Sequence, residues 1–518
     1  MKKYNKIEKV SDCTSQGIKY IIFLSLFVVL AIVQVCAQSK RSKNWVTGYS
    51  GNNVIFNVGN VTTSQGIYFP FKYFEIGNSC ISDSNGGLVL ASDGFNIYNK
   101  LGSYVEGGDT LIPLQYYIQQ SGFSIASQSS IFLPIDSNKY YFITPTFSDF
   151  RFNDCYNNSG NCYFDLLLYN LVDMNLNSGT GKVVKRMIPL MQNANLRKTQ
   201  MMACRHGNGK DWWLLKNEGD SASMHVFLFT KDSVYDKGVQ IFNEPVWGSW
   251  DIRGQSTFNS DGSLFATTSH GSSTGLIFIA DFDRCNGVLS DPYVIQMPWG
   301  SQHLPSDTTI MERLSVGLCF STNNKFLYVA SMNNLYQFDL TDSTWFHIAG
   351  LDTIASAAQG YETAYKGPDG KIYIGNFGGN SKQMSRIDSP DVKGAGCSFC
   401  PRCLRLDSLG ANAYVGTPPC MPNYGLGGQE CWPLSTQNAV EENELVVYPN
   451  PTNNLLYIKG EHLNRQVNDI MMYTLLGQMV LKKKVKTLTG KLELDISGLH
   501  AGIYFLTCNG YIKKVVIQ

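Results

Sequence analysis

Charged residues are scarce in this chain. Aspartate, glutamate, lysine and arginine make up 16% of its 518 residues, and the formal net charge is only +1. So small a net charge gives no electrostatic reason to expect a nucleic-acid partner. The compact basic run Lys482-Lys483-Lys484 is interpreted as a solvated strand end. We therefore expect no nucleic acid among the partners of this protein.

The motifs of common catalytic and metal sites are also missing. There is no Gly-x-x-x-x-Gly-Lys-Ser/Thr run for phosphates and no His-Glu-x-x-His, and the seven histidines lack metal-ligand spacing. Gly271 to Gly275 fits Gly-x-Ser-x-Gly, but a strand-like run follows where the nucleophile elbow needs a helix. Loops at Asp83 and Asp281 lack the oxygen spacing and terminal glutamate of a calcium loop. The sequence predicts no catalytic residues, no cofactor and no metal.

The apolar run near the N-terminus is short. It extends from Ile21 to Val33, against the ~20 residues that a membrane-spanning helix needs. Five lysines precede it, and Val35-Cys36-Ala37 offers small residues for cleavage. Residues 1–37 are therefore predicted to be a signal peptide, with an uncleaved anchor as the alternative.

Cysteines are the residues most informative about compartment. Removing the signal peptide leaves twelve of the fourteen, in an oxidising environment that favours disulfides. Cys155 and Cys162 bracket an Asn/Gly-rich loop and predict a local disulfide. Cys204 and Cys319 lie in apolar runs and are interpreted as core residues. Disulfides are favoured over zinc for a further group: Cys397, Cys400, Cys403, Cys420 and Cys431.

Aromatics (12%) and glycines (48) are abundant and favour strands over helices. Six segments repeat one design, a tight-turn signal followed by a strand. They are Asp83–Leu90, Asp136–Ile143, Gly207–Leu214, Ser260–Thr267, Thr322–Val329 and Pro368–Gly375. Their spacing of about 45 to 70 residues is typical of β-propeller blades with loop insertions. The predicted fold class is all-β: a seven-bladed β-propeller over residues 45–428, its last blade closed by strands near 45–60 and 400–425.

The C-terminal part has a different pattern. Residues 429–444 lose periodicity and are predicted to be a linker. Seven short strands separated by turn signals follow over residues 445–518 and predict a small Ig-like β-sandwich. They are residues 445–448, 455–459, 470–475, 478–482, 491–496, 503–508 and 512–517.

The region from Trp45 to Gly428 resembles the β-propeller domain of Bacteroidetes surface proteins, including gliding-motility-associated ones. The resemblance implies a fold and a place at the cell surface, and carries no ligand or reaction. Its matching runs are Cys80–Leu88, Ser92–Asn99, Tyr140–Thr144, Asp211–Leu215, Leu327–Val329, Leu335–Asp339, Asp369–Ile374 and Met421–Tyr424.

Residues 445–518 resemble the type A C-terminal sorting domain of the type IX secretion system. The opening motif includes Tyr448, Pro449, Asn450 and Pro451, and later matching runs contain Gly477, Gly502 and Tyr504. The resemblance implies export by the outer-membrane translocon and its sorting machinery. It further implies removal of the domain in or near the linker, with attachment to lipopolysaccharide. The expected contact points are the final strand and the turns at Gly477 and Gly502.

Tryptophans give the one hint of a ligand face. Most are expected to pack between blades. Trp247, Trp250 and Trp299 lie in glycine-containing loops and are the candidate face for a sugar or peptide.

The function expected is a secreted, non-enzymatic binding or adhesion propeller whose ligand is a polysaccharide or an envelope protein. The alternatives are an extracellular glycan hydrolase or lyase on a propeller scaffold, and a structural component of a surface assembly. Convergent carboxylates would favour the enzyme, and an aromatic, carboxylate-poor face would favour binding.

Overall fold

The computed structural model separates the chain into two compact units, Met1–Cys431 and Trp432–Gln518. The predicted signal peptide lies outside the described residues. Among the residues that are described, no helix is long and apolar enough to cross a membrane. The described residues are 40–49, 51–64, 72–158, 162–219, 222–243, 253–269, 275–298, 315–350, 360–376, 381–405, 414–431, 446–459, 463, 467–474, 478–486, 491–508 and 511–518.

The described residues of the first unit form antiparallel sheets and two short α-helices, α2 (Leu114–Gln119) and α3 (Asp149–Asn158). The first two sheets contain β1 (Asn44–Tyr49), β2 (Asn52–Asn57), β3 (Asn60–Ser64), β4 (Tyr73–Phe74), and β5 (Ser79–Ser82), β6 (Leu88–Ser92), β7 (Ile97–Asn99). The next two contain β8 (Ile131–Pro134), β9 (Lys139–Thr146), β10 (Leu166–Asp173), β11 (Lys182–Met191), and β12 (Leu196–Arg205), β13 (Trp212–Glu218), β14 (Met224–Phe229), β15 (Val234–Gln240). The last three contain β16 (Gly254–Phe258), β17 (Leu264–Ser269), β18 (Leu276–Asp283), β19 (Val288–Gln296); β20 (Ser315–Phe320), β21 (Phe326–Ser331), β22 (Asn334–Asp339), β23 (Thr344–Gly350); and β24 (Tyr361–Lys366), β25 (Ile372–Asn376), β26 (Gln383–Ile387), β27 (Phe399–Arg405).

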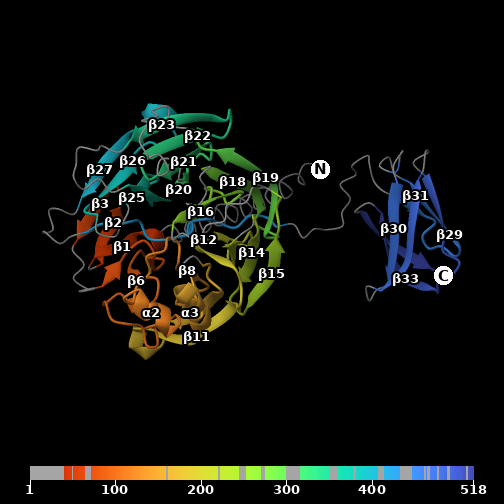
Figure 1. Ribbon diagram of the computed structural model, residues 1–518, viewed down its shortest axis with the longest axis horizontal. Coiled ribbons are helices and arrows are strands. Elements are labelled where there is room, and N and C mark those ends of the chain that lie inside the picture. The colour runs from red at the N-terminus through yellow and green to blue at the C-terminus, as the bar shows by residue number, and fades with distance from the viewer. Residues whose placement is uncertain are drawn as a thin grey trace, which may run out of the picture. The chain divides into compact units, whose positions relative to one another are not determined.

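These sheets radiate from a common centre, as Figure 1 shows, and form a β-propeller. In the five sheets from β8 to β27 the strands follow one another in chain order, so each sheet is a simple meander. The described residues of the first unit hold seven sheets, six of four strands and one of three. The seven-bladed count stays a prediction, since the β1 sheet has the order β3-β2-β1-β4 and the β5 sheet has three described strands.

All six repeated turn signals fall between the first and second strands of a sheet in the meander. The turn at Asp83 is typical, since its Oδ1 accepts hydrogen bonds from the backbone N–H groups of Asn85 (2.8 Å) and Gly87 (2.9 Å). Gly262 sits in the equivalent turn of the β16 sheet with a φ of +77°, where a Cβ would lie 2.7 Å from the Cys204 Sγ. Short side-chain acceptors and glycines therefore set the hairpins that repeat around the ring.

Large aromatic side chains hold neighbouring sheets together. The Trp212 indole N–H donates to the Pro134 carbonyl of the preceding sheet at 2.9 Å. The Trp213 indole N–H donates to the Arg284 carbonyl of the following sheet at 2.7 Å. Both tryptophans are fully buried, and Cys204 and Cys319 are buried as predicted. Each indole N–H thus has a partner where burial would otherwise leave it without one.

The ring closes differently from the prediction. Strands near residues 45–60 and 400–425 were expected in one blade, yet β1 to β3 and β27 belong to two separate sheets. The two sheets meet through side chains, since the centre of the Tyr373 ring lies 5.2 Å from that of the Trp45 ring and 5.4 Å from that of the Phe56 ring. This contact is hydrophobic packing between side chains. Unlike the pairing of strands, such packing leaves no register that a sequence pattern could reveal.

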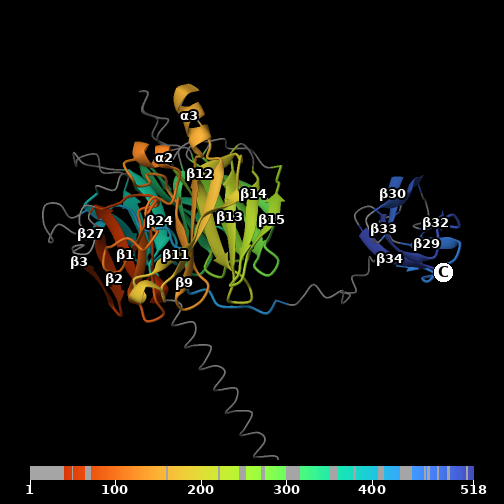
Figure 2. The same ribbon diagram turned by 90° about the horizontal axis from the view of Figure 1, so that it is seen from below.

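Figure 2 places α2 and α3 together at one end of the ring, and the last residues of the first unit run along the opposite end. The Cys155–Cys162 disulfide is present and ties the C-terminal turn of α3 to the chain that follows it. This confirms the predicted local bridge.

The second unit contains two sheets. One contains β28 (Val446–Tyr448), β29 (Leu455–Lys459) and β32 (Lys491–Asp495), and the other β30 (Val467–Thr474), β31 (Met479–Lys486), β33 (Gly502–Cys508) and β34 (Tyr511–Ile517). Leu456 and Leu494 of the first sheet share one buried cluster with Met472 and Leu506 of the second. The unit is therefore a two-sheet sandwich, and its likeness to Ig folds stays a prediction.

Candidate functional site

The last stretch of the first unit, residues 414–431, joins many sheets and is called here the closing segment. Its polar groups bond to chain portions far away in sequence. The pairs are Asn52 Nδ2 to Tyr414 O (2.8 Å), Cys420 N to Asn78 O (2.9 Å), Tyr424 OH to Phe132 O (2.9 Å), Asn423 Nδ2 to Ser260 O (3.0 Å) and Gln429 N to Gly207 O (2.7 Å). The closing segment thereby ties together loops and strands of five sheets.

A disulfide between Cys285 and Cys431 secures the end of the closing segment. Beside it, the Arg284 guanidinium donates to the Gly427 carbonyl (2.5 Å) and to the Gln429 Oε1 (3.1 Å). The first unit thus extends three residues into the stretch predicted as a linker. Sequence reasoning missed this bridge because 146 residues separate its cysteines.

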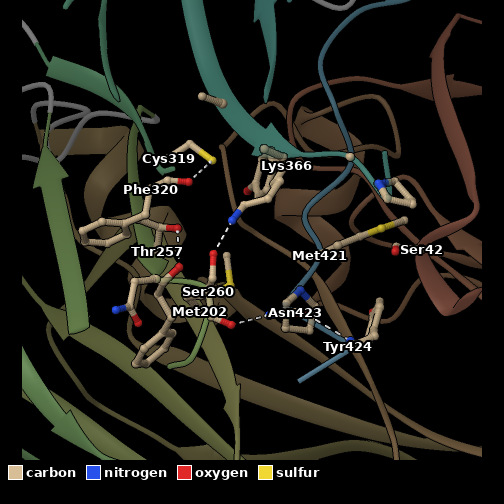
Figure 3. A pocket seen from close by; sticks show the side chains of 18 of the residues that line it. Ser42, Met202, Thr257, Ser260, Cys319, Phe320, Lys366, Met421, Asn423 and Tyr424 are labelled. Carbon is tan, nitrogen blue, oxygen red and sulfur yellow. Dashed lines mark hydrogen bonds between the residues drawn. The ribbon is translucent and has the colours of Figure 1, made fainter. Parts of the chain in front are cut away.

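A cavity of about 270 Å³ lies between the closing segment and the ends of β16, β20 and β24 (Figure 3). Its walls include the rings of Trp45, Phe258, Phe320, Tyr365 and Tyr424. Among the described residues that line it, none is an aspartate, a glutamate or a histidine. The volume lies just below the usual range for ligand pockets, so the cavity accommodates a single small molecule and no polymer.

Of the described residues that line this cavity, Lys366 is the one with a charged side chain. Its ammonium group donates to the Ser260 hydroxyl and, at 3.4 Å, to the Ser321 carbonyl, and Figure 3 shows it pointing at Ser260. Burial lowers the pKa of Lys366, because the charged form loses hydration. Burial also raises the pKa of the Cys319 thiol to about 11, so this cysteine stays protonated at neutral pH.

A second feature is a row of four aromatic rings, called here the aromatic row: Tyr414, Tyr49, Tyr73 and Phe123. Consecutive ring centroids lie 5.1, 4.9 and 5.1 Å apart. The rings come from the closing segment, β1, β4 and the loop after α2. Tyr73 is 43% exposed, which is high for an aromatic side chain held among other rings.

Polar and charged groups flank the aromatic row. The Tyr49 hydroxyl donates to the Glu75 Oε1 at 2.7 Å, and burial together with this carboxylate raises the pKa of Tyr49. Lys382 Nζ lies 5.9 Å from the centre of the Tyr414 ring. Such contacts combine an apolar surface with hydrogen-bond donors and positive charge. The four rings are far apart in sequence, so no sequence motif indicates that they form a row.

The predicted ligand-face residues Trp247, Trp250 and Trp299 lie outside the described residues, as does Gly477. The predicted cysteine group is not one cluster. Cys431 pairs with Cys285, whereas Cys397, Cys400, Cys403 and Cys420 have free thiols. In the described part of the chain, no three metal-ligating side chains come together.

The opening motif of the second unit is bonded to its final strand. Asn450 Nδ2 donates to the Lys514 carbonyl (2.7 Å), and the Val516 N–H donates to the Asn450 Oδ1 (2.8 Å). Tyr448 and Pro449 precede this contact, and the centre of the Tyr448 ring lies 5.7 Å from that of the Tyr457 ring. The side-chain amide of Asn450 thus binds the backbone of β34, which is an edge strand of its sheet. The first and last motifs of the domain meet in space.

Tyr504 and Gly502 mark the start of β33. Tyr504 is buried and its hydroxyl donates to the His500 carbonyl at 2.8 Å, which holds the turn before the strand. Gly502 is exposed, and a Cβ at this position would meet no atom closer than 3.6 Å. Nothing in the fold of the unit requires a glycine there.

No curated protein matches the chain. Among solved structures, the β-propeller domain of Cps50 (Swd1) from Myceliophteria thermophila is similar at 12% identity, covering 69% of this chain and 97% of that one, with a TM-score of 0.27. At that TM-score we base no argument on the likeness. Residues 446–518 match the family described as the secretion system C-terminal sorting domain. The chain therefore carries the address of the type IX secretion system, which exports it across the outer membrane to the cell surface or the extracellular space.

Proposed function

We propose that the propeller is a non-enzymatic binding module that a Bacteroidetes-type bacterium displays outside the cell. The partner proposed is a polysaccharide of the surroundings or of a neighbouring surface, and the role is adhesion. The observation that carries the proposal is the aromatic row, with the exposed ring of Tyr73 in it and Lys382 beside it.

Rigid rings suit a saccharide partner. They bury large area against the apolar faces of sugar rings and lose little conformational entropy. Lys382 and Glu75 supply donors and an acceptor for sugar hydroxyls. Because the Glu75 carboxylate already accepts from Tyr49, the positive charge of Lys382 favours a polysaccharide that carries acid groups.

The cavity around Lys366 supports the non-enzymatic reading. Glycoside hydrolysis commonly uses two carboxyl groups that flank the scissile bond at about 5 to 9.5 Å from each other. The described lining of this cavity offers no carboxyl group. An extracellular glycan hydrolase at this place would lack both its acid and its base.

The contact between Ser260 and Lys366 is the one observation that favours a different enzyme class, acyl transfer by a serine nucleophile with a lysine base. Two contacts argue against it. The Ser260 hydroxyl donates to the Ser321 carbonyl at 3.2 Å, so its proton does not point at the lysine. The Ser260 backbone N–H donates to the Asn324 Oδ1 at 2.9 Å and is not free to bind an oxyanion.

The remaining parts of the proposal concern display. The sorting domain is removed in or near residues 432–444, and the propeller is then attached to surface lipopolysaccharide. For the fold, the proposal is a seven-bladed β-propeller of the kind found in gliding-motility-associated surface proteins. There are two alternatives: a purely structural role in a surface assembly, and an envelope protein as the partner. An assay of saccharide binding distinguishes the proposal from both.

The test uses the exported protein purified from culture, with immobilised polygalacturonate as the acidic probe and dextran as the neutral one. Wild type is expected to be retained on polygalacturonate, and Tyr73→Ala to lose about tenfold in affinity, the usual cost of a central aromatic contact. Tyr235→Ala is the matched control, since Tyr235 is 50% exposed but lies on β15, away from the row. Equal retention of both variants would show that the aromatic row is not part of the binding site. Shortening of the polygalacturonate would overturn the non-enzymatic proposal itself.

A further inference from the structure

Eight cysteines of the described residues have free thiols, and two of them differ from the rest. Cys80, Cys204, Cys319, Cys397, Cys420 and Cys508 are buried. Cys400 and Cys403 are half-buried and both belong to β27, the last strand of the β24 sheet. They are the pair that an external reagent reaches.

The backbone of β27 brings these two thiols to one side. In a regular strand, residues three apart point to opposite faces of the sheet. Here Arg386 pairs with Cys400 and Met384 pairs with Leu404, so three residues of β27 oppose the single Ser385 of β26. Arg402 takes a φ of +51° within this bulge. The extra residues change the side to which Cys403 points.

The contacts at the bulge show the result. The Cys403 thiol donates to the Cys400 carbonyl at 3.3 Å, and the Cys400 side chain is close enough to affect the pKa of Cys403. Burial and the neighbouring Cys400 thiol raise the pKa of Cys403 to about 12, although the Arg386 guanidinium opposes the shift. Because the Cys403 thiol is engaged with the Cys400 carbonyl and is held neutral, we assign the first attack to Cys400.

We propose that Cys400 and Cys403 form a thiol–disulfide exchange site at the outer edge of the propeller, with low-molecular-weight disulfides as its substrates. The Cys400 thiolate attacks one sulfur of the external disulfide, breaks its S–S bond and leaves a mixed disulfide and a thiolate that takes up a proton. Cys403 then gives its proton to solvent and attacks the Cys400 sulfur, which releases the second external thiol. Two protein thiols are oxidised to one disulfide, and one external disulfide is reduced to two thiols. The inference is independent of the proposed saccharide ligand.

The test incubates the purified exported protein, briefly reduced under native conditions, with excess oxidised glutathione. Free thiols are then alkylated in denaturant, and the position of each modification is read by peptide mass spectrometry. We expect Cys400 and Cys403 to be joined, with neither an alkyl group nor glutathione. Buried Cys204 and Cys319 should be alkylated, and Cys155–Cys162 should stay closed.

Two variants test the order of events. Cys403→Ser should stop at the first step, so that Cys400 carries glutathione. Cys400→Ser should leave Cys403 free for alkylation. This variant should react with oxidised glutathione at least tenfold more slowly than wild type. Full alkylation of both wild-type cysteines would overturn the proposal, and so would stable glutathione on wild-type Cys400. Because the wild-type protein already decides the main outcome, a variant that fails to fold does not leave the question open.

Discussion

The two units of this protein reveal their roles in opposite ways. The sorting domain carries its motifs within residues 446–518, and its first and last motifs meet through Asn450 and the final strand. The propeller builds its aromatic row from residues as far apart as Tyr49 and Tyr414. A role carried by a short continuous stretch can be read as a motif, whereas a role assembled across sheets needs the fold.

Their cores differ in the same sense. The sandwich has one buried cluster, to which both sheets contribute. The propeller has several, each between neighbouring sheets, such as the cluster of Trp45 and Tyr373 between the first and last sheets. A ring of this kind depends on its closure, so changes at the closing segment should matter to the propeller and not to the sorting domain.

The largest effect expected separates the two units by location. Removing residues 446–518 should abolish export, because the address is lost, while the propeller retains its own core. The measurement is the fraction of protein in culture medium and on intact cells, by protease accessibility. Full-length Tyr235→Ala is the control for expression. A truncated chain that reaches the medium at the wild-type level would contradict the assignment of the address.

The second expected effect concerns the closing segment alone. Replacing Cys285 and Cys431 with alanine should lower the free energy of unfolding of the propeller by about 5 kcal/mol, because the bridge closes a long loop. The matched control replaces Cys155 and Cys162 with alanine. Their bridge closes a short loop, so its loss should lower the free energy of unfolding by about 2 kcal/mol. Urea unfolding of the purified exported proteins measures both. Equal losses, or a larger loss in the control, would show that loop closure is not what the Cys285 bridge contributes.

The third expected effect is a pH dependence that belongs to the propeller. Asp93 is buried, and burial raises its pKa to about 6, although Tyr98 and Asn96 donate to it. Its contribution to stability is therefore fully present below its unfolded pKa of about 4 and is lost as the pH rises through 6, a change of about 3 kcal/mol.

Unfolding midpoints in urea between pH 4 and 8 measure this change. Asp93→Asn should remove that part of the pH dependence, and exposed Asp109→Asn should keep it. An unchanged slope in Asp93→Asn would contradict the assignment to this carboxyl group.

The smallest expected effect tests how closely the inner strands approach. A Cβ on Gly317 of β20 would lie 2.2 Å from the Glu362 carbonyl oxygen of β24. Gly317→Ala should therefore cost about 1 to 3 kcal/mol through overpacking. Gly350→Ala, on the outer strand β23 of the same sheet, meets nothing closer than 3.7 Å and should be neutral within about 0.5 kcal/mol. Thermal unfolding compares the two, and a neutral Gly317→Ala would mean that the strands can move apart.

Local chemistry explains the successes of prediction. Turn signals marked the first hairpins of six sheets, four of them with Asp-Gly or Asn-Gly, because a tight turn needs residues that accept its dihedral angles. The Cys155–Cys162 bridge was also predicted, since seven residues separate its cysteines. The predicted closure of the ring was wrong, because Trp45 and Tyr373 meet through packing with no sequence pattern between them.

The sequence alone determined the all-β class, the hairpin turns, the local disulfide and the export address, all of which rest on residues near one another in the chain. The tertiary structure alone decided the Cys285–Cys431 bridge, the cavity around Lys366, the aromatic row and the meeting of Cys400 with Cys403. The physical reason is that side-chain packing and strand register join positions whose separation leaves no local trace.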